Sequence, residues 1–170
     1  MKKRKVFYSF HYDNDVFRVQ QIRNMGVIYG NEPVTVNDWE EIKRRGDYSI
    51  ETWINKEIAE CECVVVLIGS QTNNRRWVKY EIEQAWTQGK GLLGIYIHNL
   101  QDPRTGTTFK GMNPFSDYTT QINGQTINLA SIVRCYDPLP YNTYSDIQAN
   151  LATLVEDAIA YRQHSFGYRF

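Results

Sequence analysis

The spacing of hydrophobic residues predicts alternating strands and helices along the first hundred residues. Runs of high β propensity predict strands at residues 4–10, 63–68 and 91–98, with a shorter one at residues 34–36. Apolar residues at helical spacing predict helices at residues 16–25, 47–60 and 75–88. Residues 40–45, EEIKRR, lack a clear apolar face and indicate an exposed helical turn or loop. The chain therefore begins in the order β-α-β-α-β-α-β.

The strand predicted at residues 63–68 indicates the fold class. Its sequence, CVVVLI, is apolar at every position, which is typical of the centre of a parallel sheet covered by helices. Alternating strands and helices call for right-handed crossovers that place helices on both faces. We therefore predict an α/β, flavodoxin-like, three-layer domain with a mostly parallel central sheet. Its ligands are expected at the carboxyl ends of the strands.

The second half of the chain has a different pattern. Residues 99–132 are rich in Pro, Gly, Thr, Asn and Gln, and predict a long loop-rich insertion with a small hairpin around Asn123 and Gly124. A last strand is expected within residues 132–136. Ser145 and Gln148 form a capping-box pattern, which predicts an amphipathic helix at about residues 145–163. The 170 residues suit one domain.

Composition excludes several classes of partner. Lys plus Arg and Asp plus Glu both total 19, so the net charge gives no reason to expect a nucleic-acid partner. No apolar segment approaches the roughly 20 residues of a membrane span, and the N-terminus lacks a signal peptide, so we expect a cytoplasmic protein with no membrane partner. Cys61, Cys63 and Cys135 are read as free thiols, the first two buried in a strand, and no metal site is expected.

Candidate chemistry gathers where the predicted strands end. Residues 9–12, 37–39 and 69–81 should converge at the carboxyl edge of the sheet. In the last of these, Glu81 follows Trp77 by four residues, which places a carboxylate beside an indole on one helical face. Val78, Ile82 and Ala85 are expected to face the core, with Trp77, Glu81 and Gln84 on the neighbouring stripe.

A single carboxylate in an aromatic-walled crevice suits cleavage of an N-glycosidic bond, because positive charge builds on the sugar as the base leaves. The sequence has no Ser/His/Asp order, no Gly-rich phosphate loop and no HExxH motif, so triad hydrolases, P-loop enzymes and zinc peptidases have little support. Each of the candidate residues can also have a purely structural role. Glu81 can be solvated surface, Trp77 a core or rim residue, His11 a turn residue and Ser70 a cap, while Arg75 and Arg76 can form a solvated first turn or contact phosphate.

Two segments carry a family resemblance. KVFYSFHYDND resembles the first strand and following box of Toll/interleukin-1 receptor (TIR) domains, and VVVLIGSQTNNRRWVKYEIEQA resembles their apolar strand, Ser and W-x-x-x-E helix start. The similarity is closest to the TIR-like ThsB subunits of the bacterial Thoeris anti-phage system and covers roughly residues 4–98. It implies one TIR-like domain over residues 1–170.

The resemblance also implies a site. Glu81 would be the catalytic carboxylate, with Ser9, Phe10, Ser70 and Trp77 lining the site. The convergence of strand ends adds His11 and Asp38 to the expected substrate-binding residues. Asp38 lies in residues 34–42, VTVNDWEEI, which do not match the loop sequence usual in TIR domains, so the resemblance does not support Asp38 as a site residue. NAD would be the substrate, with no separate cofactor.

The implied activity is cleavage of the nicotinamide–ribose bond to make an ADP-ribose-derived, cyclic signalling nucleotide in anti-phage defence. Such a nucleotide would be made after a phage-derived trigger and would act on a separate effector protein, and TIR enzymes often self-associate. Two alternatives remain: a non-enzymatic TIR-like interaction module, and an enzyme like the nucleoside deoxyribosyltransferases, which also have a flavodoxin-like fold and a Glu in their site.

Overall fold

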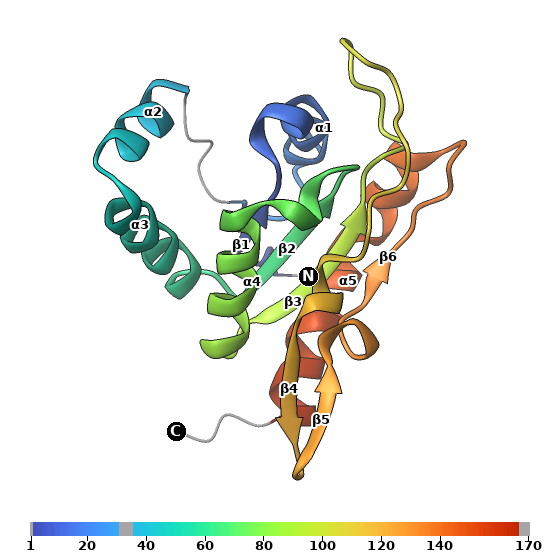
Figure 1. The fold of residues 1–170 in the computed structure, drawn as a ribbon. Helices are drawn as coiled ribbons and strands as arrows, with labels where there is room; N and C mark the ends of the chain where they lie inside the picture. The colour runs from blue at the N-terminus through green and yellow to red at the C-terminus, as the bar shows by residue number, and fades with distance from the viewer. Residues whose placement is uncertain (1, 31–35, 167–170) are drawn as a thin grey trace.

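Four parallel strands form the central sheet of the computed structural model, which describes residues 2–30 and 36–166, with the backbone alone for residues 36–39 and 166. The strands lie in the order β1-β2-β3-β6 (Figure 1). Their bounds are β1 Val6–Ser9, β2 Cys63–Ile68, β3 Gly91–Tyr96 and β6 Cys135–Tyr136. Every residue of β1, β2 and β3 is buried, as expected for strands covered on both faces.

Two pairs of helices cover the sheet. Apolar side chains of α1 (Tyr12–Asn24) and α5 (Thr143–Phe166) pack on one face, and those of α3 (Asp47–Ala59) and α4 (Arg76–Thr87) pack on the other. The predicted three-layer, flavodoxin-like α/β fold is therefore confirmed. The expected end of α4 is also present, because Gly89 has a φ of 71° and its N–H donates to the Trp86 carbonyl at 3.1 Å.

The prediction of a strand at residues 34–36 is wrong for Val36, which begins helix α2 (Val36–Arg44); residues 34 and 35 lie outside the described chain. An acidic residue such as Asp38 favours the first turn of a helix, and three β-branched positions are too few to override it. Instead Tyr29 lies parallel to Lys5 beside β1. The Val6 N–H donates to the Tyr29 carbonyl at 2.7 Å. Residues 40–44 thus belong to a helix, which contacts α3 (Figure 1).

Helices α1 and α5 both begin before the predicted residues. Helix α1 begins at Tyr12 and not at residue 16, and the Nδ1 atom of its cap, His11, accepts from the Asn14 N–H at 3.4 Å. Helix α5 begins at Thr143, so Ser145 lies inside the first turn and cannot be its cap. The preceding Asn142 carbonyl accepts from the Asp146 N–H at 3.0 Å.

The segment between β3 and β6 contains a loop followed by compact turns. Strands β4 (Thr119–Ile122) and β5 (Gln125–Asn128) form the predicted hairpin, and Asn123 and Gly124 both have positive φ, at 51° and 78°. Short 3-10 turns η2 (Pro114–Asp117) and η3 (Leu129–Ser131) flank the hairpin and bury Phe115 and Leu129 in the core beside α4. Figure 1 shows the loop after β3 extending past the strand ends, away from the hairpin.

Burial of the cysteines agrees with expectation for Cys61 and Cys63, whose thiols are free and buried, and Cys135 is free and half-buried. Across residues 2–30 and 36–166, none of the helices is long and apolar enough to span a bilayer.

Candidate functional site

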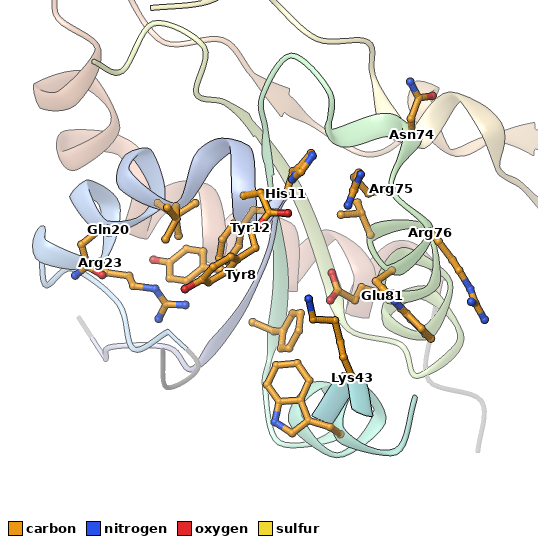
Figure 2. A pocket seen from close by; sticks show the side chains of 18 residues that line it. Tyr8, His11, Tyr12, Gln20, Arg23, Lys43, Asn74, Arg75, Arg76 and Glu81 are labelled. Atoms are coloured by element: carbon orange, nitrogen blue, oxygen red, sulfur yellow. The ribbon is translucent and has the colours of Figure 1, made fainter. Parts of the chain in front are cut away.

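A cavity of about 580 Å³ runs along the outer edge of β1 and opens where that strand ends (Figure 2). Its size lies within the range of small-molecule and cofactor sites. Its walls are formed by β1, α1, the first turns of α4 with the residues just before them, Lys43 of α2 and Trp53 of α3. Its lining side chains include Phe10, His11, Lys43, Arg75, Trp77 and Glu81.

Glu81 is the acidic group of the α4 wall. Its side chain is only 8% exposed and lies on the buried face of α4 with Val78, Ile82 and Ala85. The expected position on a neighbouring stripe with Gln84 is therefore wrong: positions 78, 81, 82 and 85 follow the i, i+3, i+4, i+7 spacing of a single core face. The sequence places a carboxylate where an apolar side chain would normally pack.

Among the residues that the structure describes, one hydroxyl bonds to this carboxylate. The Ser9 Oγ, at the end of β1, donates a hydrogen bond to Glu81 Oε2. Burial raises the pKa of Glu81 to about 8, and the bond from Ser9 opposes that rise only in part. Figure 2 shows the Glu81 carboxylate turned into the cavity, whose lining also includes Lys43.

Aromatic rings line the same part of the cavity. Trp77 makes an edge contact with Tyr80, with the ring centroids 5.8 Å apart, and the Arg76 guanidinium lies 4.5 Å from the Trp77 centroid. Phe7 and Trp53 pack together with centroids 6.0 Å apart. These contacts hold the rings in place, so a planar base could stack on them with little loss of side-chain entropy.

Cationic groups surround the cavity in greater number than acidic ones. Arg23 lies at the far end, where its guanidinium is 5.2 Å from the Tyr8 ring centroid. Arg75 and Arg76 lie at the start of α4, and Arg76 forms an ion pair of 2.8 Å with Asp47. The pKa of His11 is lowered, first by burial and then by the charge of Arg75. The guanidinium groups suit a substrate that carries phosphate groups.

The structure brings together four of the seven residues expected in the site. Phe10, His11, Trp77 and Glu81 line the cavity, while Ser9 is fully buried behind Glu81 and contacts it. Ser70 is half-buried and does not line the described cavity. The backbone of Asp38 lies in α2, and its side chain lies outside the described part of the structure.

Several lining residues were not predicted. Lys43 lies in α2 and lines the cavity. The sequence predicts a strand at residues 34–36 and no helix after it, so it does not place Lys43 beside the site. Trp53 lies in α3, a helix that the sequence predicts at residues 47–60 without marking it as part of a site. Tyr8 and Arg23 line the far end because the cavity continues around the edge of β1, and no short-range sequence signal marks such an extension.

The sequence is similar to that of a known protein family. Residues 7–102 match the family model described as the TIR-like domain of Thoeris protein ThsB. A protein of Bacillus cereus (strain MSX-D12), named as a candidate cyclic ADP-D-ribose synthase, ThsB1, is 35% identical over 133 residues, covering 74% of this chain and 69% of that relative. The family match runs from β1 to the loop after β3 and includes Ser9, Trp77 and Glu81.

Proposed function

Because the chain belongs to the TIR-like domain family of Thoeris protein ThsB, we propose that it is an enzyme that cleaves the nicotinamide–ribose bond of NAD. The ADP-ribose part is converted into a cyclic signalling nucleotide for anti-phage defence. A phage-derived trigger starts the reaction, and the nucleotide activates a separate effector protein. The name of the Bacillus cereus relative, which refers to cyclic ADP-D-ribose synthesis, supports the choice of product class.

The observation that carries the proposal is the burial of Glu81 on the wall of the 580 Å³ cavity. A buried carboxylate whose one side-chain partner in the described structure is a hydroxyl destabilises the fold, so its position needs a reason other than packing. When the glycosidic bond breaks, the electron pair leaves with the nicotinamide nitrogen and positive charge develops on the ribose. An ionised Glu81 would stabilise that charge in a site of low dielectric constant.

The second step needs only groups of the substrate and this carboxylate. A hydroxyl of the ADP-ribose part attacks the anomeric carbon, forms a new C–O bond and releases its proton to Glu81 or to solvent. Attack by water instead would give linear ADP-ribose. The aromatic walls around Trp77 would bind the planar bases, and the arginines would contact the pyrophosphate.

Both alternatives fit the site less well. An interaction module has no use for a buried carboxylate whose pKa is raised to about 8. An enzyme that exchanges bases on nucleosides has no phosphate to bind, yet Arg23, Arg75 and Arg76 all line the cavity. A phosphate-containing dinucleotide matches the charge of the walls better than an uncharged nucleoside.

The test is incubation of the full chain with NAD, with and without lysate of phage-infected cells, followed by mass spectrometry of the nucleotides. We expect nicotinamide and a cyclic ADP-ribose isomer from the wild type, and a loss of at least a hundredfold in Glu81→Gln. Glu83→Gln is the matched control, because Glu83 lies on the same helix but is exposed. Full activity and phage protection in Glu81→Gln would overturn the proposal, and base exchange without NAD turnover would support the nucleoside enzyme.

A further inference from the structure

We propose that Ser9 is a positioning residue for Glu81: its hydroxyl holds one carboxylate oxygen, leaves the other for the substrate, and sets the pH at which the carboxylate ionises. The inference rests on the proposed function of Glu81. It assigns Ser9 a different role from the substrate contact that the family resemblance implies. Ser9 would act through Glu81 and not touch NAD.

The position of Ser9 in the sheet supports this role. Ser9 is the last residue of β1 and pairs in register with Val66 of β2. Side chains alternate along a strand, so Ser9 points to the same face of the sheet as Phe7, the face covered by α3 and α4. Its side chain is 0% exposed and does not line the cavity. A hydroxyl here can reach Glu81 but not a bound substrate.

The surroundings of Glu81 make the hydroxyl important. Val78 and Ile82 flank Glu81 on α4, and Val66 of the facing β2 is fully buried. Within the described part of the chain, Ser9 is the one side chain that donates a hydrogen bond to the Glu81 carboxylate. Because Ser9 bonds to Oε2, the lone pairs of Oε1 remain for the positive charge that develops on the ribose.

Charged and titratable groups reach the cavity from the other elements packed around Glu81. The beginning of α1 contributes an imidazole and one acid, and α2 contributes an amine. The start of α4 and the far end of α1 contribute guanidinium groups. The charged or ionisable members of this set are His11, Asp13, Arg23, Lys43, Arg75 and Arg76. Tyr8 and Tyr12 add phenol groups. None of these groups, over the described residues, forms an ion pair with Glu81, so the local hydroxyl remains its direct partner.

Hydrogen bonds donated to a charged acceptor favour the charged form, and they are stronger than those between neutral groups. Loss of the Ser9 hydroxyl should therefore make Glu81 harder to ionise. It should also let the carboxylate rotate, so that Oε1 is no longer fixed. The first effect moves a pH profile, and the second lowers the rate even where Glu81 is fully ionised.

The experiment compares wild type with Ser9→Ala, Ser9→Cys and Ser9→Thr. Thr143→Val is the matched control, because it removes another buried hydroxyl, which donates to the Leu139 carbonyl at 2.9 Å on the distant helix α5. Two quantities are measured: the pH dependence of kcat/KM for NAD cleavage, and the carboxyl ¹³C titration of Glu81 in protein without substrate, assigned by its absence in Glu81→Gln. Circular dichroism checks that each variant is folded.

We expect the Glu81 midpoint to rise by about one pH unit in Ser9→Ala, which lowers kcat/KM at acidic pH about tenfold. Ser9→Cys, which keeps the volume but is a weak donor, should give a smaller rise and serves if Ser9→Ala does not fold. Ser9→Thr keeps the hydroxyl and should leave the midpoint of the Glu81 titration at its wild-type value. Thr143→Val should also leave it unchanged.

An unchanged midpoint in the folded Ser9→Ala and Ser9→Cys variants would overturn the inference, even if their activity is low, because that result means a purely structural role. The titration needs no substrate, so it tests the link between Ser9 and Glu81 even if the wild type does not cleave NAD. Failure of the proposed function and failure of this inference are therefore distinguishable.

Discussion

Gly111 packs directly on the backbone of Gly69, so closely that a Cβ atom at position 111 would lie 2.0 Å from the Gly69 carbonyl oxygen. A Cβ atom at Gly69 would in turn lie 2.1 Å from Oδ2 of Asp15. The start of α1, the loop after β2 and the loop after β3 therefore stack at the strand ends, next to the cavity. The insertion that follows β3 is part of the framework that holds Ser70 to Arg75.

Gly111→Ala should weaken this stack. The new methyl group would meet a backbone carbonyl, which cannot move aside as a flexible side chain could, and we expect a loss of about 1–3 kcal/mol in the free energy of unfolding. Chemical denaturation measures the loss. Met112→Ala is the control, because Met112 is the next residue and its side chain is 71% exposed. Equal stability of the two variants would mean that the loop can separate from Gly69 without cost.

Arg18→Met should destabilise the same region from the other side. The Arg18 side chain is fully buried, forms an ion pair of 2.9 Å with Asp15, and donates to the carbonyls of Leu100 and Gly106 at 2.9 and 2.7 Å. Removing it leaves a buried acid without its ion pair and the Leu100 carbonyl without its donor, while the Gly106 carbonyl still accepts from the Asp102 N–H at 3.0 Å. We therefore expect a loss of about 3–5 kcal/mol in unfolding free energy.

The double variant Asp15→Asn with Arg18→Met tests the cause of that loss. Neutralising the acid removes the unpaired charge, so the double variant should be more stable than Arg18→Met alone. Arg45→Met, which breaks an exposed ion pair with Glu41, should change the unfolding midpoint little. A double variant less stable than the single one would show that the bonds to the loop, and not the charge, dominate.

The sequence predicts the layers of this fold better than its edges. The run Cys63–Ile68 identified a buried central strand because every position is apolar, and Asn123 with Gly124 identified a hairpin because both tolerate positive φ. The region after α1 could not be predicted, since Tyr29 joins the sheet through a single bridge that leaves no alternating pattern. For the same reason the sequence did not predict helix α2 or the position of Lys43 in the site.

The candidate site was predictable to a similar degree. Spacing alone placed Glu81 beside Trp77, and topology brought both near His11 at the strand ends. Spacing could not show that Glu81 would be buried opposite Ser9, since that contact joins residues 72 positions apart in the chain. Local spacing could not predict the burial of Arg18, because two of its acceptors, the carbonyls of Leu100 and Gly106, lie in the loop after β3.

Trp77→Ala should weaken substrate binding more than turnover. The ring lines the cavity and is held by Arg76 and Tyr80, so a base that stacks on it would lose roughly 1–3 kcal/mol of binding, which raises KM about tenfold. Trp77→Phe should recover part of the loss. Trp86→Phe is the control, since the Trp86 Nε1 donates to Thr120 of the hairpin at 3.1 Å, away from the cavity. A normal KM in Trp77→Ala would exclude stacking on this ring.

Glu81→Gln should stabilise the protein, and more so as the pH rises. In the unfolded chain Glu81 ionises near its ordinary pKa of 4.5, whereas in the folded protein its pKa is about 8. Between these values the folded state holds the extra proton, so the free energy of unfolding of the wild type falls as the pH rises from 4.5 to 8. Below that window both states are protonated and the penalty disappears.

Glutamine cannot ionise, so the stability gained by Glu81→Gln over wild type should grow between pH 5 and pH 9, by on the order of 3 kcal/mol. Denaturation curves of both proteins at several pH values measure this difference, and Glu83→Gln, on the exposed face of α4, should show almost none of it. A difference that does not change with pH would mean that Glu81 ionises as readily in the folded protein as in water. In that case burial would not explain how the carboxylate is prepared for catalysis.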